Sequence, residues 1–148
     1  MHPTSLAILA VVIGGALTAL QGPTNARLAG AVNSPVNAAL ISFAVGTVAL
    51  LVLAAALQSR PDVAATRALP WYSWLGGLYG AVFVVAAAYA VPKLGVATTI
   101  TLMVAGQMLL SLFLDHFGFM GVPRQPITPT RLAGVVMLIG GVLLVRKG

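Results

Sequence analysis

Polar residues that could bind a solute gather in two short stretches of an otherwise apolar chain. In the first stretch, Gly14, Thr18, Gln21 and Asn25 are spaced by four, three and four residues, so a helix places them on one face. A polar face of this kind is typical of a membrane helix that lines a cavity. Arg27 follows two residues later and could attract an anionic solute. We therefore predict cavity-lining or substrate-binding roles for Thr18, Gln21, Asn25 and Arg27.

The dipeptide Gly22-Pro23 interrupts this first stretch. Proline has no N–H, and its ring crowds the carbonyl one turn earlier, which predicts that the helix kinks or ends near residues 22–23. If a new helix begins at Pro23, Gln21 and Asn25 lie beside its N-terminus, which favours anionic groups. The alternative is that the helix ends at Gly22 and that Asn25 belongs to a solvated loop.

A second polar face is formed by Gln107, Ser111 and Asp115, which are spaced by four residues. We predict that Gln107 and Ser111 line the cavity, and that Asp115 is a candidate for binding a coupling proton or cation. The alternative for Asp115 is solvation at the membrane interface, or an ion pair with Arg124 or Arg131. His116 has too few partners nearby to indicate a metal site.

Tyr79 lies about two turns inside the third apolar segment, so we expect it near the middle of the membrane. Its hydroxyl needs a hydrogen-bond partner there. The side chain could line a pocket, where aromatic rings suit organic cations, or bond within the bundle. The sequence leaves both possibilities open.

The composition indicates an integral membrane protein. Of 148 residues, 59% are hydrophobic and only 7% are charged, against about 25% charged in a soluble domain. Cysteine and glutamate are absent, and there are two aspartates and two histidines, so paired-carboxylate, triad and metal-dependent enzymes lack their parts. We expect no catalytic residues, no metal and no cofactor. The net charge of +6 is spread over segment edges rather than along a basic stripe, which argues against a nucleic-acid partner.

Five apolar segments predict five transmembrane helices in a single all-α domain over residues 1–148. Their approximate bounds are residues 4–22, 36–57, 71–91, 96–115 and 129–146. Each is close to the roughly 20 residues that cross a bilayer, and strand-like alternation is missing. The N-terminus has no cationic region before its apolar run, so we expect it to be retained as the first membrane helix.

The cations are balanced across the membrane. With five crossings, four cations fall on the side of the N-terminus and four on the opposite side, namely Arg60, Arg67, Arg124 and Arg131 against Arg27, Lys93, Arg146 and Lys147. Because positive charge normally orients a membrane protein, this balance predicts that copies insert both ways and pair as an antiparallel homodimer. The alternative is a single orientation fixed by other features, such as gradients of hydrophobicity.

Several segments resemble the short inner-membrane exporters of the YdcZ type, a family in the drug/metabolite transporter superfamily. They are QGPTNARL, NSPVNAALISFAVGT, WYSWLGGLYGAVFV, LGVATTITLMVAGQMLLSLFLDHFG and RLAGVVMLIGGVLLV. The resemblance implies a five-helix unit that matches half of a ten-helix inverted-repeat transporter, in a bacterial-type inner membrane. It places Gln21, Asn25 and Arg27 in the first block of the family pattern and Gln107 and Asp115 in the fourth-helix block. The related small multidrug resistance transporters use a glutamate in their first helix, and this chain has none.

We therefore expect a transporter that moves a small molecule or ion, with export as its direction, by alternating access in an antiparallel homodimer within the lipid bilayer. Helices one to four of each copy line the site, and the fifth helix, marked by Gly134, Gly140 and Gly141, packs the dimer. The alternatives are a passive channel with the same bundle, and a non-transporting membrane subunit of a hetero-oligomer. The sign of the substrate's charge stays open.

Overall fold

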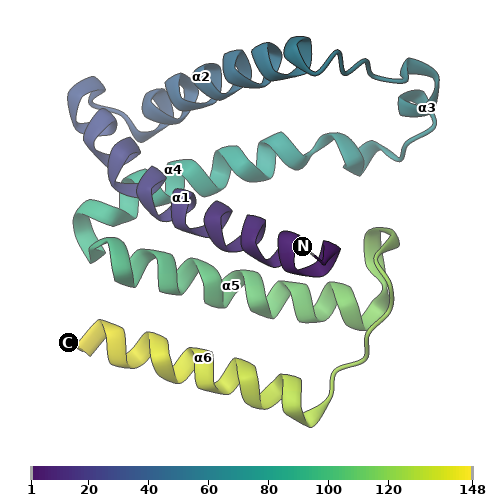
Figure 1. The fold of residues 1–148 in the computed structure, drawn as a ribbon. Coiled ribbons are helices and arrows are strands. Elements are labelled where there is room, and N and C mark those ends of the chain that lie inside the picture. Colours follow the sequence, from purple (N-terminus) through teal and green to yellow (C-terminus); the bar gives the residue numbers. More distant parts are fainter. Residues whose placement is uncertain (1, 148) are drawn as a thin grey trace. The chain divides into compact units, whose positions relative to one another are not determined.

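The computed structural model describes residues 2–147, and no strand occurs among them. Five helices are long and apolar enough to cross a membrane (Figure 1), which confirms the prediction of an all-α integral membrane protein. These spans are α1 (Pro3–Val32), α2 (Pro35–Ala56), α4 (Gly76–Leu94), α5 (Val96–Phe117) and α6 (Pro129–Lys147). The shorter elements are α3 (Val63–Arg67) and the 3-10 turns η1 (Trp71–Trp74) and η2 (Phe119–Gly121).

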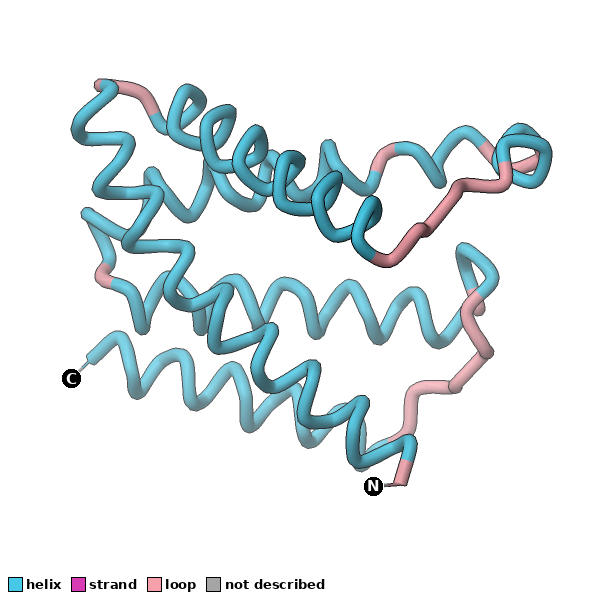
Figure 2. The backbone as a smooth tube through the Cα atoms, turned by 45° about the horizontal axis from the view of Figure 1, so that its top comes forward, coloured by secondary structure: helices cyan, strands magenta, loops and turns pink. Residues whose placement is uncertain are grey.

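The chain divides into two compact units, each described here by itself. Unit 1 extends to Lys93 and contains α1 to α4, and unit 2 begins at Leu94 and contains α5, η2 and α6. Figure 2 shows that loops occur only at the ends of helices, with the longest ones before α3 and before α6. The expectation of one five-helix domain stays a prediction.

The first helix is longer than the sequence indicated. α1 has 30 residues, is about 45 Å long at 1.5 Å per residue, and contains Pro23 in its interior. The prediction that the helix ends at residues 22–23 is therefore wrong, and so is the alternative of a loop at Asn25, whereas a kink at this point stays a prediction. No helix N-terminus lies beside Gln21 either. In lipid, ending a helix leaves several backbone groups without water, whereas an interior proline removes one hydrogen bond, so the helix continues.

The other predicted spans are close to the observed ones. Ser34 caps α2, because its hydroxyl accepts a hydrogen bond from the Asn37 N–H at 3.2 Å. The third span begins with η1 and becomes α-helical at Gly76. Pro92 lies inside α4, and the turn between α4 and α5 consists of Gly95 alone, whose φ of +79° suits glycine.

Unit 1 is held together by small side chains. Ala29 of α1, Ala38 of α2 and Ala88 of α4 form a buried cluster, against which Leu28 and Val32 pack. α1 and α4 approach closely at Gly22, where an added Cβ would lie 3.3 Å from Cγ2 of Val91. Small residues let helices approach in lipid, where packing rather than water drives association.

In unit 2, α5 and α6 pack against each other. Val135 and Val142 of α6 are buried, and their spacing of seven residues places them on one face. Thr99 of α5 is also buried, and its hydroxyl donates to the Gly95 carbonyl at 2.7 Å. Near the opposite end of α5, Phe113, Phe117 and Phe119 form an aromatic cluster.

The spans bury little of themselves within the chain. In the most apolar part of each span, at most 22% of the residues are buried. Most of this surface is therefore available to contact lipid or another protein.

Candidate functional site

The polar residue that the structure buries most deeply in α1 is Asn25. It is 2% exposed and lies between the other two buried residues of α1, Gly22 and Ala29, at spacings of three and four. This face of α1 packs against α2 and α4, because Gly22 approaches Val91 and Ala29 joins Ala38 and Ala88. The Nδ2 atom of Asn25 has no hydrogen-bond partner within the part of the chain that the structure describes. A buried amide donor therefore lies unpaired in the α1–α2–α4 contact.

Gln21 lies one turn before Asn25 on α1, is exposed, and lines an open groove with α2. The groove has a volume of about 200 Å³. Its other lining residues are Ser42, Phe43, Gly46, Thr47 and Leu50. The Thr47 hydroxyl is used within its helix, since it donates to the Phe43 carbonyl at 2.8 Å. The polar groups of this groove that can meet a solute are thus the Gln21 amide and the Ser42 hydroxyl.

The first polar face is therefore split by the structure. Thr18 is half-buried and its hydroxyl donates to the Gly14 carbonyl at 2.9 Å. Arg27 is exposed, and its separation of two residues from Asn25 places the two side chains on different sides of α1. Residues 14, 18, 21 and 25 share one face of a helix, and their spacing did not reveal that Asn25 is buried and Gln21 is exposed.

Two tyrosines of α4 face outward. Tyr79 is 54% exposed, and no hydrogen bond to its hydroxyl occurs among residues 2–147. Tyr89 is also exposed, and Nζ of Lys93 lies 3.5 Å from the centre of its ring. This cation–π contact was missed in the sequence, although the spacing of four residues on a helix could have indicated it.

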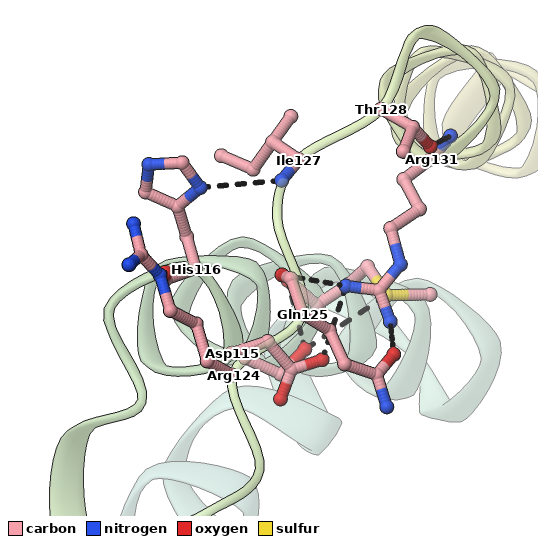
Figure 3. A network of polar contacts seen from close by, with 9 residues as sticks. Asp115, His116, Arg124, Gln125, Ile127, Thr128 and Arg131 are labelled. Carbon is pink, nitrogen blue, oxygen red and sulfur yellow. Dashed lines mark hydrogen bonds and ion pairs between the residues drawn. The ribbon is translucent and has the colours of Figure 1, made fainter.

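Asp115 forms an ion pair in unit 2, as one alternative from the sequence predicted. Its Oδ2 lies 3.3 Å from Nη1 of Arg131, at the junction of α5 and α6 (Figure 3). Arg131 also donates from Nη1 to the Gln125 carbonyl at 3.2 Å and from Nη2 to the Gln125 side chain. The Gln125 N–H donates to the Asp115 carbonyl at 2.7 Å. These bonds tie the loop before α6 to the end of α5.

His116 holds the same loop. Its Nδ1 accepts a hydrogen bond from the Ile127 N–H at 3.2 Å, and Nε of Arg124 donates to its carbonyl at 3.0 Å (Figure 3). The remaining members of the second polar face are exposed: Gln107 is on the surface, and the Ser111 hydroxyl donates to the Met108 carbonyl at 2.9 Å. Between residues 2 and 147, no three metal-ligating side chains form a group.

Comparison with known proteins gives two matches. A protein-family model described as "Putative inner membrane exporter, YdcZ" matches residues 6–144. The chain is also similar to the inner membrane protein YdcZ of Escherichia coli K12, with 32% identity over 77 residues, which are 52% of this chain and 52% of that protein. The aligned part thus spans about half the length of this curated relative. No solved structure matches the chain.

The family match extends over nearly the whole chain and covers all five apolar helices. It agrees with the resemblance of the first-helix and fourth-helix blocks, and it makes the protein a multi-pass inner-membrane protein. The chain belongs to the YdcZ family of inner-membrane proteins.

Proposed function

We propose that the protein exports a small solute across the inner membrane and works by alternating access as an antiparallel homodimer. The family description supports export, and the five membrane-spanning helices support transport. The observation that carries the proposal is the polar groove of Gln21 and Ser42, which is open on the surface of unit 1.

The depth of this groove is what makes a second chain necessary. Gln21 lies about 27 Å along α1 from Pro3 and about 17 Å before Val32, so it lies within a span rather than beyond it. Polar side chains at such depth rarely face lipid, and they normally line a cavity or a helix contact. An adjacent copy would cover the groove and enclose its amide and hydroxyl.

Inverted pairing follows from the charges. Four cations flank the membrane on each side, so neither orientation of a five-span chain is favoured. Two inverted copies supply the ten helices and the in-plane pseudo-two-fold axis of many secondary transporters. A site built in this way is the same when viewed from either side of the membrane, which suits alternation between two open states.

We place the dimer contact on α6. Its outer surface carries a hollow of about 720 Å³, lined by Met137, Gly140, Gly141, Leu143, Leu144 and Lys147. A Cβ added to Gly140 or Gly141 would meet nothing within 4 Å in the same chain. Glycines that have no close neighbour in their own chain leave room for a helix of another copy.

The moving part in this proposal is the α1–α4 contact. It rests on glycine and alanine, so its separation exposes little apolar surface, and it contains the unpaired Asn25 amide. A solute that bonds to the open state and not to the closed one shifts the equilibrium between them. Thr18, Gln21, Gln107 and Ser111 are the further candidates for the path, with Arg27 and Tyr79 at the surface.

Two measurements test the proposal. Reporters fused to the C-terminus should give signals on both sides of the membrane, and a signal on one side alone would remove the antiparallel dimer. A thermal-shift panel should find solutes that stabilise the purified protein, and these should exchange across proteoliposomes with saturable rates.

The alternatives give different results in the same experiments. Flux that rises linearly with solute concentration would indicate a passive channel. A protein that binds no solute and assembles only when a second, different chain is added would indicate a non-transporting subunit. Asn25→Ala and Gln21→Ala should each weaken the thermal response, while Thr24→Ala, an exposed neighbour, should not.

A further inference from the structure

We infer that the transported solute presents hydrogen-bond acceptors, such as a carboxylate or carbonyl, to the Asn25 amide, and that it is not a cation held by a carboxylate of this chain. The inference rests on the proposed function and names the chemistry of its site. It depends on three observations in the structure, namely an unpaired buried donor, two carboxylates that are already in use, and a helix contact that can open.

The donor is the Nδ2 group of Asn25. It is 2% exposed, and no acceptor contacts it within residues 2–147. An unsatisfied buried donor is costly, so native proteins keep few of them, and those kept commonly have a functional reason. The other two buried residues of α1, Gly22 and Ala29, offer no polar side chain. The closed α1–α4 contact therefore holds a donor that a solute can satisfy.

Cation recognition by a carboxylate is not available in this chain. Its only acidic residues are Asp62 and Asp115. Asp62 caps α3, and its Oδ1 accepts hydrogen bonds from the Ala64 and Ala65 N–H groups, both at 3.0 Å. Asp115 is paired with Arg131. Both carboxylates lie at helix ends and both are engaged, so the spans provide donors for an acceptor and no anion for a cation.

The position of the donor gives the solute an effect on the helix contact. Asn25 is buried on the face of α1 that packs against α2 and α4, one turn from the point where Gly22 approaches Val91. It becomes available when α1 and α4 separate. An acceptor-bearing solute then binds the separated state alone, which is the differential affinity that drives a conformational change. Anionic acceptors form the stronger bonds to such a donor, so they should be preferred over neutral ones.

Because the chain has no cysteine, one introduced thiol reports on this contact without a known substrate. Ala29→Cys places the thiol on the Asn25 face, one turn away, at a buried position. The protein is reconstituted in liposomes and treated with two methanethiosulfonate reagents, the anionic ethylsulfonate and the cationic ethyltrimethylammonium. Each rate is divided by the rate of the same reagent with free cysteine, which removes the intrinsic difference in reactivity.

We expect the normalised rate of the anionic reagent to exceed that of the cationic one by about tenfold, the factor that one hydrogen bond to a charged acceptor supplies. Adding Asn25→Leu, which has a similar volume and no donor, should remove this preference. Adding Thr24→Val should leave it unchanged, because the Thr24 hydroxyl is used within α1, where it donates to the Leu20 carbonyl.

The other outcomes separate the two proposals. If the cationic reagent reacts as fast as the anionic one or faster, the acceptor class is overturned and transport through this contact stands. If the anionic preference persists in Asn25→Leu, it comes from the general positive charge of the protein, and the role of Asn25 is overturned. If neither reagent reacts, the α1–α4 contact does not open to water, and the alternating-access function fails with it.

Discussion

Asp115 of α5 and Arg131 of α6 form an ion pair, with 3.3 Å between Oδ2 and Nη1, at the end of unit 2 where the chain turns from one span to the next. The side chains are 35% and 31% exposed, so water reaches both of them. Together with Gln125, the pair fixes the course of the loop that precedes α6. This is a structural role, and it leaves the carboxylate engaged with a cation.

We predict that Asp115→Asn has a small effect on stability and none on solute exchange. A half-exposed ion pair contributes about 0.2–1 kcal/mol, so the melting temperature in detergent should fall only slightly. Arg131→Gln should give a similar change, and the double variant should show that the two effects are not additive. If exchange in Asp115→Asn loses a dependence on the proton gradient that the unchanged protein has, Asp115 is a coupling residue after all.

The unpaired amide of Asn25 should make the protein less stable than it could be. Replacing it with leucine, which has nearly the same volume, removes a buried donor that lacks a partner, and this should raise the free energy of unfolding by about 1–3 kcal/mol. Thermal unfolding in detergent measures the change. The same variant should lose the stabilisation that acceptor-bearing solutes confer. A leucine variant that melts at a lower temperature would mean that Asn25 has a partner in the membrane.

Substitution of Gly22 should show how closely α1 and α4 approach. In Gly22→Ala the new Cβ would lie 3.3 Å from Cγ2 of Val91, which is stiff because valine is β-branched, so we expect a loss of about 1–3 kcal/mol. Gly14→Ala is the matched control in the same helix, because a Cβ there meets nothing within 4 Å. The loss should shrink when Val91→Ala is added. Equal behaviour of Gly22→Ala and Gly14→Ala would show that the helices do not meet at this point.

Gly141 tests the dimer contact on α6. Nothing in the same chain lies within 4 Å of an added Cβ, so Gly141→Leu should leave the fold of the monomer intact and weaken self-association. Light scattering in detergent, or cross-linking in native membranes, measures the dimer fraction. Gly106→Leu makes the same change on α5, also without a close neighbour, and should leave dimerisation unchanged. Dimerisation of Gly141→Leu at the level of the unchanged protein would place the contact elsewhere.

Removing flanking cations from one side of the membrane should make the chain insert in a single orientation. Arg60→Gln with Arg67→Gln leaves two cations on one side and four on the other, and Arg146→Gln with Lys147→Gln produces the opposite bias. Each double variant expressed alone should insert in one orientation and give few dimers, and co-expression of the two should restore them. If either double variant expressed alone forms as many dimers as the two expressed together, the copies pair in parallel.

The five spans could be predicted from the sequence because their signals are local. Twenty or so apolar residues determine a crossing, and Ser34-Pro35 and Thr128-Pro129 mark helix starts by rules that need no neighbouring helix. The extension of α1 through Pro23 was missed because it depends on the solvent. In water a proline commonly ends a helix, but in hydrocarbon the backbone groups of a helix end have no alternative partners.

The candidate site was predicted only in part. Asn25 was identified by its spacing, but its burial depends on Ala38 and Ala88, which are close only after α2 and α4 pack. The groove of Gln21 needs Ser42 and Thr47 from the next helix, and no spacing within one helix shows that pairing. For Asp115 the sequence offered Arg124 and Arg131 equally, and the structure of the loop decided between them.

The length of α1 exceeds the thickness of the hydrocarbon layer that this helix crosses. A helix of about 45 Å is longer than the roughly 30 Å of hydrocarbon it must cross, so it has to tilt or to extend into the headgroups. A thicker bilayer would decrease the tilt of α1 from the bilayer normal, and a thinner bilayer would increase it. Because α1 and α4 approach closely at Gly22, we expect a change of tilt to alter the angle at which the two helices meet, so the thickness of the bilayer should affect this contact.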